Sequence, residues 1–272
     1  MAGRKPITYA GTELNRRHFL AGLSLATLAG VGLARCVVGA QPRVAQAATE
    51  SAGPPPVVAA RMALPGGGAL SSIPGDADLL ALTLDDGVNT DVVRLYTEFA
   101  RDTGVRLTYF VNGTYRSWLE NRDLLRPLVE SGQIQLGNHT WSHPDLATLP
   151  KHQVAEQLRR NHRFLMKNYG VDARPYYRPP YGSHNPVVDA VAVELGYSVP
   201  TLWSGSLEDQ NLIAEDEIVK MANKYFNPQA IVIGHLNHLP VTHVYGQLVD
   251  VIRARNLRTV TLDDVFAKPK AA

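Results

Sequence analysis

Two adjacent carboxylates are the first residues in this chain that could do chemistry. Asp85 and Asp86 follow the apolar run 79–84 and precede Gly87. Carboxylates at the end of a buried strand are costly to desolvate unless a cation compensates them. Neighbouring side chains point to opposite faces of a regular strand, so both can face one cavity only where the chain bends, as Gly87 permits. A surface Asp-Asp-Gly turn is the plainer alternative.

A pair of histidines offers matching metal ligands. His139 and His143 follow the short apolar run 134–136. Histidines four residues apart lie on one face of a helical turn and can share a metal ion. Two imidazoles and one carboxylate suit zinc, cobalt or a similar first-row ion and leave coordination positions open. Taken alone, this pair could also be two unrelated loop histidines.

Two further polar clusters follow apolar runs. Arg178 precedes the segment 179–181, whose two prolines stiffen the backbone before Tyr181. An arginine there can neutralise a carboxylate and lower its pKa. His235 comes shortly after the apolar run 230–233. A histidine in that position can act as a general acid, although it can also simply cap the strand.

The runs around these clusters predict strands that alternate with helices, which implies a parallel sheet. Polar clusters at the carboxyl ends of such strands are typical of active sites in α/β proteins. Strands are expected at 79–84, 106–111, 134–136, 176–178, 198–202, 230–233 and 258–260, and helices at 90–103, 115–131, 150–169, 186–195, 215–225 and 244–255.

The first 47 residues are typical of an export signal. Arg16 and Arg17 precede the apolar run 21–34, and a small-residue cleavage site ends at Ala47. This pattern indicates a twin-arginine signal peptide, with an ordinary signal or an uncleaved anchor as alternatives. The run is short for a membrane span, so no stable span is expected after processing. Cys36 is the only cysteine, so the processed chain would contain none.

The segments after the signal differ from it in charge and composition. The chain has 27 basic and 25 acidic residues, but its first 47 residues hold six basic residues and one acidic residue. The net charge therefore falls from +2 to −3 after processing, and no nucleic-acid partner is expected. Residues 48–74 are rich in Ala, Gly, Pro and Ser and are interpreted as a flexible linker or a loosely packed arm. Residues 75–268 are enough for a single domain.

Together and in this order, the four clusters resemble the motifs of the polysaccharide deacetylase family (carbohydrate esterase family 4, the NodB-homology domain). The T-F-D-D-G-P-like motif is matched by 83–87, and H-[ST]-x-x-H by 139–143. The R-x-P-Y motif is matched by 178–181, and L-x-H by 233–235 with Ile for Leu. The similarity extends over roughly 79–266.

This resemblance implies a fold and a cofactor. The fold would be a single-domain α/β distorted (β/α) barrel, expected with seven strands. One divalent metal ion, zinc before cobalt or another first-row metal, would be held by Asp86, His139 and His143.

The resemblance also implies catalytic roles. Asp85 would be the base that deprotonates the attacking water, and Arg178 would hold Asp85. His235 would be the acid that protonates the departing amine. The backbone N–H of Tyr181 would help to bind the oxyanion.

One family motif is only partly matched. The motif D-x-x-D-W aligns with 206–210, so Ser206 replaces the first Asp, which is taken as the partner of the acidic histidine. Gln210 replaces the Trp that lines the acetyl pocket. Glu208 or Asp209 could substitute as the partner of the histidine. Contacts with the substrate are expected from Tyr181, Trp203 and Asp209.

The expected function is removal of acetyl groups from N-acetylated sugars of a peptidoglycan-like or chitin-like polysaccharide. The expected protein is a monomer that is secreted, periplasmic or associated with the cell wall. Two alternatives stay open. One is an O-acetyl esterase of the acetylxylan type, because an alcohol leaves an ester with less help from a general acid than an amine needs. The other is a glycan-binding homologue with impaired catalysis.

Overall fold

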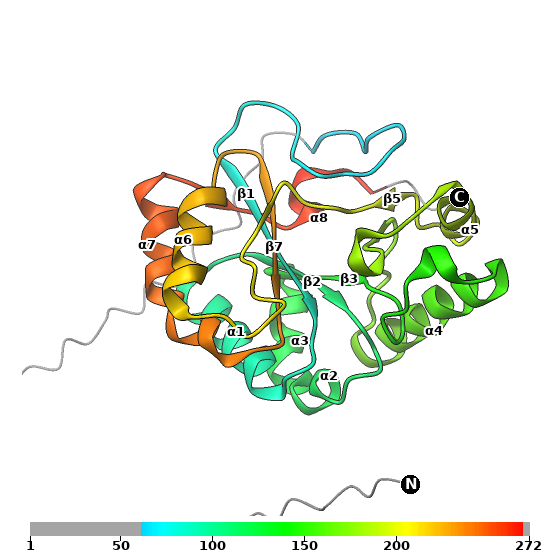
Figure 1. Cartoon of the computed structure of the whole chain (residues 1–272), viewed down its shortest axis with the longest axis horizontal. Coiled ribbons are helices and arrows are strands. Elements are labelled where there is room, and N and C mark those ends of the chain that lie inside the picture. The colour runs from blue at the N-terminus through cyan, green and yellow to red at the C-terminus, as the bar shows by residue number, and fades with distance from the viewer. Residues whose placement is uncertain (1–60, 269–272) are drawn as a thin grey trace, which may run out of the picture. The chain divides into compact units, whose positions relative to one another are not determined.

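The computed structural model describes residues 61–268, which are built on a parallel sheet (Figure 1). Seven strands follow one another across it in the order β5-β4-β3-β2-β1-β7-β6, and β8 pairs with the start of β1. Their bounds are β1 Leu79–Asp86, β2 Leu107–Val111, β3 Ile134–Asn138, β4 Tyr176–Tyr177, β5 Val199–Pro200, β6 Gly205–Ser206, β7 Ala230–His235 and β8 Arg258–Thr259.

The sheet curls because its two ends are close together in the sequence. A flat path of seven strands would place β5 and β6 about 29 Å apart. The chain from Pro200 to Gly205 can span at most about 18 Å. The ends must therefore approach each other, which confirms the predicted distorted barrel with a seven-strand path.

Helices surround this sheet, with α6 and α7 at one side of Figure 1 and α4 at the other. The expected helix at 115–131 is instead two helices that meet at Asn121, whose side chain donates to the carbonyls of Thr90 and Ser117. The helices are α1 Thr90–Thr103, α2 Ser117–Glu120, α3 Arg122–Glu130, α4 Lys151–Tyr169, α5 Pro186–Glu194, α6 Glu215–Tyr225, α7 Tyr245–Ala254 and α8 Leu262–Val265, with single 3₁₀ turns η1 Leu146–Thr148, η2 Pro180–Gly182 and η3 Leu239–His243.

Part of the expected linker 48–74 packs on the domain. The N–H of Met62 donates to Val265, and the N–H of Leu70 donates to Pro200, both at 2.8 Å. Leu70 and Ile73 are buried in the core. The linker interpretation is therefore wrong for the residues from Met62 onward, because scattered apolar residues dock there without a periodic pattern. Residues 48–60 lie outside the described range.

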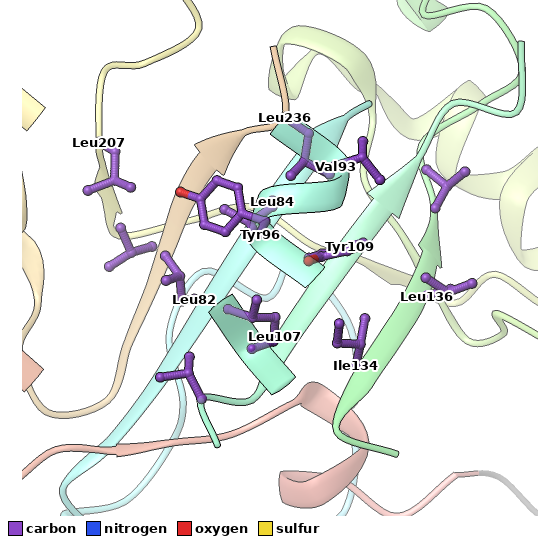
Figure 2. Packing of buried hydrophobic residues seen from close by; sticks show 14 of the residues in the cluster. Leu82, Leu84, Val93, Tyr96, Leu107, Tyr109, Ile134, Leu136, Leu207 and Leu236 are labelled. Atoms are coloured by element: carbon purple, nitrogen blue, oxygen red, sulfur yellow. The ribbon is translucent and has the colours of Figure 1, made fainter. Parts of the chain in front are cut away.

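The alternation of side chains along β1 separates the core from the site. Leu82 and Leu84 face the helices, where Val93 and Tyr96 of α1 pack on the same side of the sheet (Figure 2). The residues that alternate with them along β1, beginning with Leu79, face the barrel interior. The same period of two places Asp85 inside the barrel.

No helix within 61–268 is long and apolar enough to cross a membrane. The predicted signal peptide at 1–47, with its paired arginines and Cys36, lies outside the described residues.

A missing side chain on β3 makes room inside the barrel. A Cβ atom on Gly137 would lie 2.6 Å from the ring of Phe110, which is closer than two carbon atoms can approach. The ring of Phe110 in turn supports the guanidinium group of Arg178, 4.2 Å from its centroid. Glycine at this position therefore lets an aromatic ring lie beneath a buried arginine.

We predict that Gly137→Ala lowers the free energy of unfolding by about 1–3 kcal/mol, because the added methyl group overpacks this layer. Urea denaturation measures the change. Gly66→Ala is the matched control, since no atom lies within 4 Å of a Cβ atom built there. Equal stability of the two variants would contradict the packing argument.

Candidate active site

The carboxyl ends of β1, β3 and β7 border a cavity of about 530 Å³. The parallel register places Asp85 of β1 beside His235 of β7. Seven of the predicted site residues line this cavity, while Arg178 and Asp209 lie behind its wall. The seven are Asp85, Asp86, His139, His143, Tyr181, Trp203 and His235.

A bend at Asp86 brings both carboxylates to the cavity. Asp86 itself has φ 74°, so the chain leaves the strand conformation one residue before the predicted glycine. Its carbonyl accepts hydrogen bonds from the indole of Trp118 at 3.1 Å and from the N–H of Asn112 at 3.2 Å. Gly87, at φ 94°, lies so close to Trp118 that a Cβ atom would be 2.4 Å from the indole. The Asp-Asp-Gly sequence is thus part of the site, not a surface turn.

Asp86, His139 and His143 converge as metal ligands would. Each offers one ligand atom, and these atoms lie within 4.8 Å of one another. The Nδ1–H of His139 donates to the carbonyl of Arg178 at 2.7 Å, which leaves its Nε2 facing the carboxylates. Among the described residues, the buried Oδ1 atom of Asp86 has no hydrogen-bond donor. A buried carboxylate oxygen without a donor fits coordination to a cation.

The histidine segment is a loop, so the predicted helical turn is wrong. Thr140 and His143 have φ values of 71° and 61°, which no α-helix contains. The hydroxyl of Thr140 accepts the N–H of His143 at 3.1 Å, and Asn138 accepts the N–H of Thr140 at 2.9 Å. These side-chain bonds fold the loop so that the two imidazole centroids lie 4.8 Å apart.

Unusual backbone conformations gather around the cavity. Seven non-glycine residues within 61–268 have positive φ, and five of them belong to the site loops. Such conformations cost about 1 kcal/mol or more each, and they persist where surrounding contacts impose them. The five are Asp86, Thr140, His143, Tyr181 and Glu208.

The electrostatics of Asp86 and His143 favour metal binding. For His139, burial lowers the pKa, but the charge of Asp85, followed by Asp86, raises it overall. Burial raises the pKa of Asp86, but the neighbouring imidazoles of His139 and then His143, together with the hydrogen bond from Asn237, lower it well below its usual range. Burial and then the charge of His139 lower the pKa of His143. An ionised carboxylate and a neutral imidazole are the forms that coordinate metals.

Arg178 binds Asp85 deep in the barrel. Its Nη1 donates to Asp85 at 2.7 Å and to the hydroxyl of Thr83 at 2.9 Å. Its Nε and Nη2 donate to the carbonyls of Thr201 and Leu202. Arg178 is fully buried, so its charge needs these acceptors. One oxygen of Asp85 is thereby fixed, and the other faces His139 at 3.5 Å.

Asp209 binds His235 from behind. The Nδ1–H of His235 donates to one Asp209 oxygen at 3.0 Å, and its backbone N–H donates to the other at 3.2 Å. Burial lowers the pKa of His235, but Asp209 outweighs this and raises it overall. The histidine therefore has a carboxylate partner despite Ser206, whose hydroxyl accepts the N–H of Glu208.

The three expected substrate contacts occupy different positions. Asp209 is only 2% exposed and does not line the cavity, so a direct contact with substrate is not supported. Tyr181 is 71% exposed, and its ring lies 4.7 Å from that of His143. Trp203 lines the same cavity and packs near Arg178.

The sequence analysis missed Asn237. Its side-chain N–H donates to the second oxygen of Asp86 at 2.7 Å, and its carbonyl oxygen accepts the N–H of Val88 at 3.3 Å. This leaves the orphan oxygen of Asp86 directed at the two histidines. The only signal in the sequence was its position two residues after His235, so its contact with β1 depends on the tertiary fold.

We predict that Asn237→Ala weakens Zn²⁺ binding about ten- to a hundredfold, because residues that orient a metal ligand contribute to affinity on this scale. Asp86→Ala should abolish it. Isothermal titration calorimetry measures both. Asn223→Ala, an exposed asparagine whose side chain bonds only its own helix, is the control. Wild-type affinity in Asn237→Ala would rule out the orienting contact.

Comparisons with known proteins agree with this geometry. The family model for polysaccharide deacetylase matches residues 72–200. The chain is 26% identical over 178 residues to the bifunctional xylanase/xylan deacetylase of Cellvibrio japonicus, covering 65% of this chain and 26% of that protein. It is also 26% identical over 189 residues to the peptidoglycan-N-acetylglucosamine deacetylase PgdA of Listeria monocytogenes, covering 70% of this chain and 39% of that one.

Solved structures show the same architecture. The chitin deacetylase of Colletotrichum lindemuthianum matches with a TM-score of 0.67 and 26% identity, over 76% of this chain and 95% of that one. The chain spans only about a quarter to two-fifths of the two curated relatives, so it shares one domain with them. With the barrel, the paired carboxylates and the two histidines in place, residues 72–200 of this chain match the polysaccharide deacetylase family.

Proposed function

We propose that this protein removes acetyl groups from N-acetylated sugars of a peptidoglycan-like or chitin-like polysaccharide and releases acetate. One observation carries the proposal. A carboxylate held by Arg178 and a histidine held by Asp209 lie in register on neighbouring strands beside the Asp86, His139 and His143 cluster.

The three clustered residues would hold one divalent ion. We propose zinc, with cobalt or another first-row ion as alternatives, because the donors are two imidazoles and one carboxylate. When bound, such an ion lowers the pKa of a water molecule and polarises an acyl oxygen.

The base half of the reaction belongs to Asp85. Arg178 fixes one of its oxygens, and the other is free to take a proton from the attacking water. The neighbouring guanidinium group holds the carboxylate in place against the cavity. The N–H of Tyr181 donates to no acceptor among residues 61–268, so it is available to the developing oxyanion.

The acid half belongs to His235. Asp209 holds the proton on Nδ1, so Nε2 is the atom that can donate to the departing amine. A charged imidazole is favoured because Asp209 raises the pKa of His235. General acid and base groups of this kind each contribute about 10²–10⁴-fold to the rate.

The esterase alternative loses its main support. It depended on His235 lacking a carboxylate partner, since an alcohol leaves with less help than an amine. Asp209 supplies that partner. We therefore propose amide hydrolysis, on a substrate outside the cell membrane that a monomeric, twin-arginine-exported enzyme would reach.

Acetate release tests the proposal. Wild-type protein should release acetate from N-acetylchitooligosaccharides or peptidoglycan with Zn²⁺ or Co²⁺ and stop when a chelator is added. Asp85→Asn should lose at least about 100-fold in kcat while it still binds Zn²⁺. Release from acetylxylan alone would identify an esterase, and tight glycan binding without acetate would identify a non-catalytic homologue. Full activity of Asp86→Ala would refute the metal assignment.

The proposed role of His235 leads to a separate prediction about how activity depends on pH. The acid must be protonated, so activity falls as pH rises through the pKa of His235. Asp209→Asn removes the charge that raises this pKa, so the loss of activity should begin at a lower pH. Rate profiles and NMR titration of the imidazole measure the shift.

Glu208→Gln is the control for this pH experiment. The Glu208 carboxylate is exposed, lines the active-site cavity, and accepts only from Gln210 among the described residues, with no hydrogen bond to His235. The profile of this variant should match that of the wild type. A shift in Glu208→Gln, with none in Asp209→Asn, would mean that Glu208 is the partner of His235.

A further inference from the structure

We propose that a second, cationic groove beside the active-site cavity binds carboxylate groups carried by the substrate polymer. The inference rests on the proposed deacetylase function. The groove has a volume of about 510 Å³ and lies between the loop after β2 and helix α4. Four cationic side chains line it: Arg116, Arg160, Arg163 and Lys167.

The charged residues that line this groove are all cationic. No acidic residue lines it within the described part of the chain, whereas Asp85, Asp86 and Glu208 line the active-site cavity. Arg160 and Lys167 have no carboxylate partner among residues 61–268. The groove therefore offers net positive charge to a ligand.

Its two other cations are only weakly neutralised. Arg163 pairs with Glu156 at 2.9 Å, and Arg116 pairs with Glu120 at 3.3 Å. All four side chains of these two pairs are at least 42% exposed, and exposed pairs of this kind contribute little. An incoming carboxylate can therefore compete for these arginines.

An aromatic wall completes the groove. The guanidinium group of Arg160 lies 4.1 Å from the ring centroid of Trp141. Phe164 packs edge-to-face against Trp141 at 5.9 Å, and both residues are partly exposed. An aromatic face next to cationic groups suits a sugar ring that carries an anionic substituent.

The groove lies near the active-site cavity, because one of its lining residues belongs to the loop that carries two candidate metal ligands. Trp141 lies between the two candidate metal ligands His139 and His143 in the same loop, and its carbonyl accepts the N–H of Thr114 at 3.1 Å. Burial first, and then the charges of Asp86 and Tyr181, raise the pKa of the groove residue Tyr115. A polymer with one sugar in the cavity can therefore extend into the groove.

Spacing along α4 presents the charges together. Residues 160, 163 and 167 recur at helical intervals of three and four, so they lie along one face. This arrangement suits a ligand with several anionic groups along a chain. The occupant we infer is a carboxylate-bearing N-acetylated glycan such as peptidoglycan, and not a neutral chitin strand.

The test compares charged and neutral ligands. Arg163→Gln/Lys167→Gln is made on an Asp85→Asn background so that ligand is not consumed. Calorimetry measures binding of soluble peptidoglycan fragments and of neutral N-acetylchitohexaose. The double change should weaken binding of the fragments about five- to tenfold in low salt, leave the neutral ligand unchanged, and lose its effect in high salt.

Lys220→Gln/Arg253→Gln is the matched control. It removes two cations from α6 and α7, on the far side of the sheet from α4 in Figure 1, and the first of them is ion-paired with Glu217. It should bind both ligands like the parent. Equal loss of both ligands, or no loss of either, in the groove variant would overturn the proposal. Binding needs no turnover, so this result is independent of whether wild-type protein releases acetate.

Discussion

The site depends on the buried ion pair between Arg178 and Asp85. A fully buried guanidinium group is tolerated only when its donors are matched, and removal of one partner costs about 3–5 kcal/mol. Its acceptors come from β1 and from residues 201–202, which lead from one end of the sheet to the other. The pair can therefore form only when the sheet has curled, and it links closure of the barrel to the orientation of Asp85.

Other contacts hold the strained loops in place. Trp118 fixes the bend at Asp86, and Asn237 reaches across from the end of β7 to the same carboxylate. Asn138, which receives the N–H of Thr140, is itself held by Asn161 of α4 at 2.9 Å. Left-handed backbone at non-glycine residues is thus stabilised by side chains from separate elements, and the functional groups begin from a preorganised geometry.

Asp85 and His235 are held in place in the same way. Each reactive group has a buried partner on its far side, Arg178 for Asp85 and Asp209 for His235. The partners have opposite charge to the groups they hold, and Asp209 raises the pKa of the His235 imidazole against the effect of burial. The active-site cavity is lined by acidic residues, whereas the groove at α4 is lined by cationic ones. We regard this difference in charge as the feature that would select among N-acetylated polymers.

The sequence by itself determined most of the order of strands and helices and the residues of the candidate metal triad, because period-two and period-3.6 patterns and short motifs are local properties. It missed the two-residue strand β6 and the short helix α8. Tertiary structure decided the rest. The helical turn at His139 was wrong because Thr140 and Asn138 bond the loop into another shape. Asp209, and not residue 206, is the hydrogen-bond partner of His235, because a loop without periodicity determines which carboxylate points inward. Asn237 meets Asp86 151 residues away in the chain, and only the parallel pairing of β1 with β7 makes them neighbours.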